Sequence, residues 1–262
     1  MLYQNMIKTD ADVTGVCPTK KQVEALPFFR ELRYNNYTII LTEMNAMKQY
    51  FEIVDVTARE VVGLKFEPTV EVEITLDDET VGRASVPAGM KNAREISIAV
   101  DNVNMEISEA LVAMNALDQA SIDRLLLEID GTENTSRLGA NALMAVSLAC
   151  AKAAAISSGL SLYNYIGGVN AKMIPNLMED GEALCLSDYA TLTQFLNAAA
   201  QERIENKKLI LSAGPGEGED AVMADLAVAL NAEGLVTSSP AVYNELMRIE
   251  EELFDVPEYP ET

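Results

Sequence analysis

Histidine is absent from this 262-residue chain. The protein therefore lacks the side chain that most often serves as an acid or base near neutral pH and most often ligates metals. Any catalysis must rely on lysine, tyrosine, cysteine or carboxylate side chains. This absence narrows the possible chemistry before any motif is considered.

Basic residues are also scarce, with 19 Lys and Arg against 41 Asp and Glu, which gives a formal net charge of −22 and a sequence pI of about 4.3. Such a chain repels phosphate backbones and anionic lipid headgroups. The composition argues against nucleic acid and membrane surfaces as partners.

Cysteines are few and widely spaced, at Cys17, Cys150 and Cys185. Their odd number and separation argue against a disulfide framework and against a metal site, so we expect reduced thiols and no cofactor. The amino terminus has no apolar signal-like run, and the longest apolar stretch, 138–151, is too short to span a bilayer. We expect a soluble, cytoplasmic protein.

Residues 52–159 show two hydrophobic periodicities, one typical of strands and one typical of helices. Apolar residues alternate with polar ones after Thr69, which predicts a half-buried strand flanked by strands at 52–62 and 81–86. Residues 122–129 repeat at helical spacing with Gly131 as a stop, and an Ala-rich helix follows from Leu138 to Ser158, ending at Gly159. An antiparallel three-stranded meander with helices on one face results.

The second half predicts three strand–helix pairs. Expected strands cover 183–186, 208–212 and 235–238, and expected helices cover 191–203, 217–231 and 241–253. Only 90 residues follow Lys172 (262 − 172), whereas a complete (β/α)₈ barrel takes about 250. These 90 residues are therefore too few for a complete barrel, and 173–182 is expected to be only a short connection.

These patterns predict three parts: an arm at 1–50, an α+β domain at 51–172 and about three β/α units at 173–262. The arm contains Phe28, Phe29 and a predicted strand at 37–41, which would be costly to leave in water. We expect it to pack on the exposed edges of the parallel strands or on a second copy.

Residues 117–168 read LDQASIDRLLLEIDGTENTSRLGANALMAVSLACAKAAAISSGLSLYNYIGG, and this segment resembles enolases. The upstream run DVTAREVVGLKFEPTVEVEITLDDETVGRASVPAG is similar to the opening strands of the enolase N-terminal domain. Downstream, KKLILSAGPGEGEDAVMADLAVALNAEGLVTSSP and YNELMRIEEEL resemble the end of the enolase barrel. Matched segments cover most of 52–253. The resemblance implies that 51–172 is an enolase N-terminal-like domain and that 173–262 is a truncated α/β barrel remnant of about three β/α units.

The resemblance implies a reaction, the dehydration of 2-phosphoglycerate with a lysine base, a glutamate acid, two magnesium ions and a mobile serine loop. The matching positions do not carry those groups. The base lysine falls on Cys185, the histidine and phosphate-binding arginine fall on Ala213 and Gly214, and a substrate-binding lysine falls on Val236. The serine loop is replaced by 88–92, which has no hydroxyl. A catalytically inactive chain without bound cofactor is the prediction.

The charged residues of the enolase dimer contact, unlike those of its active site, have matching residues in this chain. Enolase dimers pair an arginine and a glutamate of the N-terminal strands with a glutamate and an arginine of the last helix. The matching residues are Arg59, Glu71, Arg248 and Glu251, for which exposed surface charge is the alternative interpretation. The resemblance therefore implies a homodimer, with a heteromer containing a genuine enolase as a further possibility.

The leading prediction is an inactive enolase-like protein that acts as an assembly or regulatory partner. The alternatives are an enolase-type lyase (phosphopyruvate hydratase) completed by a partner chain and a small-metabolite sensor. Two local patterns are interpreted structurally: the carboxylates at 77–79 as a hairpin tip, and the glycines at 214–218 as a turn before a helix. Cys185 as a nucleophile is disfavoured because no histidine is present to activate it.

Overall fold

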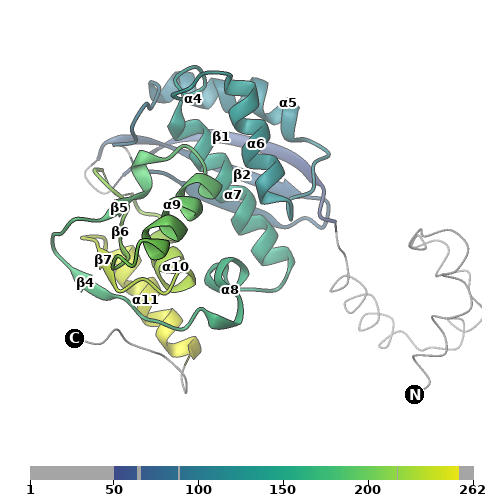
Figure 1. Ribbon diagram of the computed structural model, residues 1–262. Coiled ribbons are helices and arrows are strands. Elements are labelled where there is room, and N and C mark those ends of the chain that lie inside the picture. The colour runs from purple at the N-terminus through teal and green to yellow at the C-terminus, as the bar shows by residue number, and fades with distance from the viewer. Residues whose placement is uncertain (1–49, 64–65, 88, 217, 254–262) are drawn as a thin grey trace, which may run out of the picture. The chain divides into compact units, whose positions relative to one another are not determined.

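The computed structural model describes residues 50–253 except 64, 65, 88 and 217 (Figure 1). The predicted arm at 1–50 therefore lies, apart from its last residue, outside the described residues. The described chain contains a three-stranded antiparallel sheet followed by a four-stranded parallel sheet.

The antiparallel sheet consists of β1 (Ile53–Val62), β2 (Pro68–Leu76) and β3 (Val81–Ser85) in sequence order. Along β2 the side chains alternate, so that Val70, Val72 and Ile74 are buried while Glu71 and Glu73 are half-buried on the other face. The predicted meander is confirmed. The carboxylate-rich segment after Leu76 forms the turn into β3, as predicted.

Helices cover the apolar face of this sheet (Figure 1). A nearly continuous helical run contains a π-helical segment at its centre, and two longer helices follow. Their bounds are α4 (Ile96–Asn102), η2 (Val103–Ile107), α5 (Ser108–Leu111), α6 (Gln119–Asp130) and α7 (Ala140–Ser157).

The helix boundaries follow from capping residues. Helix α6 begins at Asp118, whose side chain accepts a hydrogen bond from Ser121 N at 3.1 Å, and ends at Gly131, whose φ of 66° is the left-handed conformation that glycine tolerates. Helix α7 ends before Gly159, also at positive φ. Both predicted stops are confirmed.

Helix α7 is the centre of the core. It is the one described helix long and apolar enough to cross a membrane, but it is mostly buried inside the protein. Its small residues let β3 approach closely, since a Cβ on Gly82 would lie 2.3 Å from Ala149 O and from Ala153 N. The Ala-rich composition therefore serves close helix–sheet packing.

The parallel sheet has the order β4-β7-β6-β5, and helices follow three of its strands (Figure 1). Its elements are β4 (Asn176–Met178), β5 (Leu184–Cys185), α9 (Leu192–Ile204), β6 (Ile210–Ser212), α10 (Val222–Ala229), β7 (Gly234–Val236) and α11 (Pro240–Leu253). Short helices α8 (Leu162–Gly167), η3 (Gly168–Asn170) and η4 (Leu186–Asp188) connect them. The prediction of a partial α/β barrel with three β/α units is confirmed.

Two details of that prediction are wrong. The segment 173–182 is more than a connection, because β4 within it pairs in parallel with β7. In a closed barrel the first strand neighbours the last, so β4 takes the place of a first strand. Helix α10 starts at Val222 rather than at 217, because Asp220 accepts a hydrogen bond from Val222 N at 2.9 Å and ends the preceding turn.

Candidate functional site

The carboxyl ends of the parallel strands are where α/β folds bind ligands. One register row runs across all four strands there and contains Met178, Val236, Ser212 and Cys185. These side chains are a thioether, an isopropyl group, a hydroxyl and a thiol. The row therefore offers no charged group, and two of the predicted degenerate positions, Cys185 and Val236, lie in it.

The residues that follow β6 leave no room for a side chain at 214 that could bind phosphate. Ala213 is buried, and its carbonyl accepts a hydrogen bond from Ser187 N at 3.1 Å. Gly214 has φ of 93°, and a Cβ there would lie 2.0 Å from Ser187 Oγ. A side chain at 214 is therefore excluded both by the backbone conformation and by Ser187.

The thiol of Cys185 is not activated by its surroundings. It lies 3.6 Å from Ala183 O, to which it donates a weak hydrogen bond. Burial, and secondarily the charge of Asp188, raises its pKa, so the thiolate is disfavoured at neutral pH. The interpretation of Cys185 as a poor nucleophile agrees with this environment.

The segment that aligns with the enolase serine loop lies over the same strand ends. Gly89 N donates to Pro215 O at 3.0 Å, and Lys91 N donates to Ser187 O at 2.8 Å. Met90 between them is buried. A Cβ on Gly89 would meet Pro215 O at 2.3 Å, so the segment is packed directly against the loop that follows β6.

The magnesium ions implied by the resemblance do not fit these residues. Magnesium prefers an octahedron of hard oxygen ligands, chiefly carboxylates, water and phosphate. The register row supplies one hydroxyl oxygen and two sulfur atoms. Within the described ranges, no group of three or more His, Cys, Asp or Glu side chains is arranged to hold a metal ion.

The four charges predicted to form a dimer interface are distributed over three elements, β1, β2 and α11. Arg59 and Glu71 lie opposite each other on β1 and β2 and form an ion pair, with Nη1 to Oε1 at 2.7 Å. Arg248 on α11 pairs with Glu245 at 2.7 Å, and Glu251 is exposed on the same helix. Within one chain the strand pair and the helix pair are thus not joined to each other.

The open face of the antiparallel sheet extends this charge pattern. Glu73 lies next to Glu71 on β2 and accepts hydrogen bonds from Arg59 and from Arg83 of β3. These two arginines lower the pKa of Glu73 to about 2, with the hydrogen bond from Arg59 as the larger cause. The sheet therefore presents an alternating ladder of two arginines and two glutamates.

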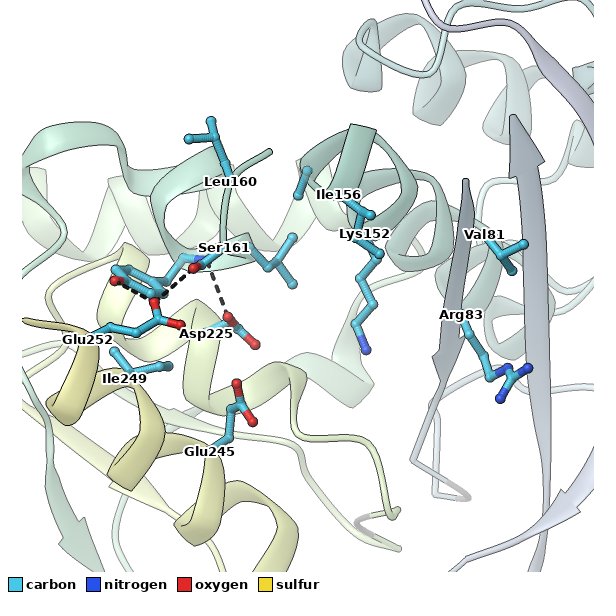
Figure 2. Close-up of a pocket in the computed structure, with 13 residues that line it drawn as sticks. Val81, Arg83, Lys152, Ile156, Leu160, Ser161, Asp225, Glu245, Ile249 and Glu252 are labelled. Carbon is cyan, nitrogen blue, oxygen red and sulfur yellow. Dashed lines mark hydrogen bonds between the residues drawn. The ribbon is translucent and has the colours of Figure 1, made fainter. Parts of the chain in front are cut away.

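A cavity of about 540 Å³ lies beside that ladder, between β3, α7, α8, α10 and α11 (Figure 2). One wall is apolar and another contains carboxylates. The lining residues are Val81, Arg83, Lys152, Ala155, Ile156, Leu160, Ser161, Leu162, Tyr163, Asp225, Glu245, Ile249 and Glu252.

Asp225 is the most perturbed group in this cavity. Its Oδ1 accepts a hydrogen bond from Tyr163 N at 3.2 Å. Burial, reinforced by the charge of Glu245, raises the pKa of its carboxyl to about 7. A half-neutralised carboxylate at physiological pH is typical of binding sites.

The remaining polar groups of the cavity are held by the protein. Glu252 accepts hydrogen bonds from Ser161 Oγ at 2.8 Å and from the Tyr163 hydroxyl at 3.1 Å. Lys152 Nζ lies 2.6 Å from Asp220 Oδ1. Sequence reasoning missed this site, although one aspartate in the apolar run VMADLAVAL was a signal for Asp225.

A second cavity of about 600 Å³ lies at the amino ends of β5 and β6. Leu184 and Ile210 line it together with Met178 of β4, and Lys207 and Glu202 form an exposed ion pair at its rim. It lies where the sheet lacks further strands between β4 and β5.

Two family models match the chain. The model described as "Enolase, N-terminal domain" matches residues 90–166, and the model described as "Enolase, C-terminal TIM barrel domain" matches residues 169–261. The first match covers helices that follow the antiparallel sheet, and the second covers the parallel sheet with its helices. Together with the antiparallel meander and the partial barrel, they show that this chain belongs to the enolase family.

Proposed function

We propose that this chain is a catalytically inactive member of the enolase family that acts as an assembly or regulatory partner. The observation that carries this proposal is the row Met178, Val236, Ser212 and Cys185 at the carboxyl ends of the parallel strands. A proton-abstraction reaction on a phosphorylated acid needs a base and charged ligands at that position. The row has neither.

The packing around Gly214 supports the same conclusion. Ser187 lies where a side chain at 214 would begin, and the loop at 89–91 is hydrogen-bonded to Ser187 and Pro215. Ser187 therefore occupies the space that the family's phosphate-binding side chain would need. The difference from the family is thus larger than the replacement of one arginine. Acquiring such packing is consistent with a chain whose strand ends no longer receive substrate.

The proposed interface uses Arg59, Glu71, Arg248 and Glu251. A two-fold contact is self-complementary, so a patch carrying both signs of charge can meet its own copy. Both parts of the patch meet this requirement. The strands contribute Arg59 and Glu71, and helix α11 contributes Arg248 and Glu251. Glu71 would meet Arg248, and Arg59 would meet Glu251, in a cytoplasmic homodimer or in a heteromer with a complete enolase.

Sedimentation velocity tests the interface. The wild-type chain should sediment as a dimer, and Arg248→Glu should give monomers because it places like charges opposite each other. Arg124→Glu is the matched control, since Arg124 is exposed on α6 and pairs only loosely with Glu128, at 3.9 Å. A wild-type protein that stays monomeric at high concentration, alone and with a complete enolase, would refute the proposed role.

A further inference from the structure

The cavity between β3, α7, α8, α10 and α11 has an unbalanced charge pattern (Figure 2). Three carboxylates face it from the two C-terminal helices: Asp225 from α10, and Glu245 and Glu252 from α11. Two cations face it from the other side, Lys152 from α7 and Arg83 from β3. Which of these charges already have partners decides what the cavity can bind.

Both cations already pair with carboxylates other than Asp225, Glu245 and Glu252. Lys152 Nζ is within 2.6 and 2.8 Å of the two oxygens of Asp220. Arg83 is hydrogen-bonded to Glu73 on the open face of the sheet. Neither forms an ion pair with Asp225 or Glu245 in the described part of the chain.

The carboxylates, by contrast, are held mainly by neutral donors. Asp225 accepts from a backbone N–H, and Glu252 accepts from two hydroxyls. Glu245 has one ion pair, with the exposed Arg248 three residues along α11. Figure 2 shows the carboxylates of Asp225 and Glu245 directed towards the same space, with Lys152 across from them.

The rest of the lining is aliphatic. Val81, Ile156, Leu160, Leu162 and Ile249 contribute branched side chains around the carboxylates. The volume of about 540 Å³ falls in the range of roughly 300–1,000 Å³ that small-molecule sites occupy. An occupant must therefore combine a positive group with an apolar stem.

We propose that this cavity binds an aliphatic cation, a primary ammonium or guanidinium group on a hydrocarbon stem, with Asp225 and Glu245 as the charge partners. The cationic group would lie between the two carboxylates, while the stem would contact Ile156 and Ile249. A guanidinium fits best, because its planar fork can donate to two carboxylates at once. The natural occupant would be either a free small molecule with such a group or a lysine or arginine side chain of a second copy of this chain.

Titration calorimetry with butylguanidinium at constant ionic strength tests the proposal. We expect saturable binding that pentanol and pentanoate, which have similar stems without the positive charge, do not reproduce. The double substitution Asp225→Asn with Glu245→Gln should weaken binding at least tenfold. The control Glu128→Gln, on the exposed surface of α6, should leave it unchanged.

The pH dependence is a second readout. Binding should tighten about tenfold from pH 6 to pH 8, following the ionised fraction of Asp225. Glu245, Glu252, Lys152, Arg83 and Tyr163 also face the site, and Asp220 lies behind Lys152. Burial raises the pKa of Tyr163 to about 12, so its hydroxyl stays neutral over this range. In Asp225→Asn the dependence should be lost.

Sedimentation in the same titration separates the two sources. Dissociation of a dimer by butylguanidinium would identify a second copy's side chain as the natural occupant, whereas binding without dissociation would indicate a free amine. The proposal is overturned if neither monomer nor dimer binds butylguanidinium, or if binding is unaffected by the double substitution. Far-ultraviolet circular dichroism of each variant verifies that it is folded.

Discussion

At the scale of single residues, Gly214 marks a position after β6 where a larger side chain does not fit. Its backbone lies at positive φ, which costs other residues about 1–2 kcal/mol, and Ser187 Oγ occupies the position of a side chain. The family resemblance aligns Gly214 with a phosphate-binding arginine. In the structure an arginine side chain does not fit at this position.

The substitution Gly214→Arg should therefore destabilise the protein without creating a phosphate site. We expect a loss of about 2–4 kcal/mol in the free energy of unfolding, from backbone strain and overlap with Ser187. Urea denaturation with and without 2-phosphoglycerate measures both effects. The companion variant Gly214→Arg with Ser187→Gly should recover part of the loss. An unchanged unfolding midpoint in Gly214→Arg would contradict the packing described.

Asp225 makes stability depend on pH. Its folded pKa of about 7 lies above the value near 4 of an unfolded aspartate, so its stabilising contribution is complete below about pH 4 and is lost as pH rises through 7. The full shift corresponds to about 4 kcal/mol. Asp225→Asn should gain stability relative to wild type between pH 5 and pH 8, as measured by thermal unfolding. A constant difference over that range would argue against the raised pKa.

At the scale of elements, buried polar side chains of α6 and α7 fix the start of α9. Asp123 Oδ2 accepts from Thr193 N at 2.8 Å, and Ser147 Oγ accepts from Leu192 N at 2.9 Å while donating to Asp123. Gln119 also donates to Asp123, at 2.9 Å. The carboxylate is thus placed at a helix amino terminus, where its charge is favoured.

Asp123→Ala should cost about 3 kcal/mol, because it removes the acceptor of the Thr193 N–H and of the Ser147 hydroxyl in the interior. Chemical denaturation measures the change, and hydrogen exchange should show the first turn of α9 opening more often. Glu128→Ala on the exposed side of the same helix is the control, expected within about 0.5 kcal/mol. Equal effects of the two variants would exclude the capping role.

The sequence predicted elements well where periodicity was strong and poorly where tertiary pairing decides. Alternation located β2 and glycine stops located the ends of α6 and α7. Strand β4 escaped detection because it is three residues long, directly follows Pro175 and is specified by pairing with β7. The alignment of Cys185 and Val236 with ligand positions is a prediction from family resemblance. The cavity around Asp225 was missed because it joins residues from five separate elements.

At the scale of the whole molecule, Asp220 links elements of the two sheet regions. Its carboxylate contacts Lys152 of α7, accepts from Ser85 N of β3 at 2.9 Å, and accepts from Val222 N at the start of α10. Asp220 and Lys152 are mostly buried, with side-chain exposures of 9% and 21%. This ion pair is therefore one of the contacts that join the antiparallel sheet region to the barrel remnant.

Asp220→Ala should cost about 3 kcal/mol, because it leaves Lys152 as a largely buried charge without its carboxylate partner. Restoring neutrality with Asp220→Ala and Lys152→Met should recover most of that loss. The exposed pair Arg124–Glu128 gives the comparison, since its removal should change stability by less than about 1 kcal/mol. Thermal unfolding of all three variants decides, and an equal loss in the single and double variants would contradict the account.

We propose that this chain retains an enolase fold without enolase chemistry. The dehydration of 2-phosphoglycerate with magnesium, followed by absorbance of the enol product, tests this proposal most directly. We predict no turnover above the protein-free control for the chain alone, and no increase beyond the partner's own rate when a complete enolase is added. Turnover by the purified chain, lost on denaturation, would contradict the claim.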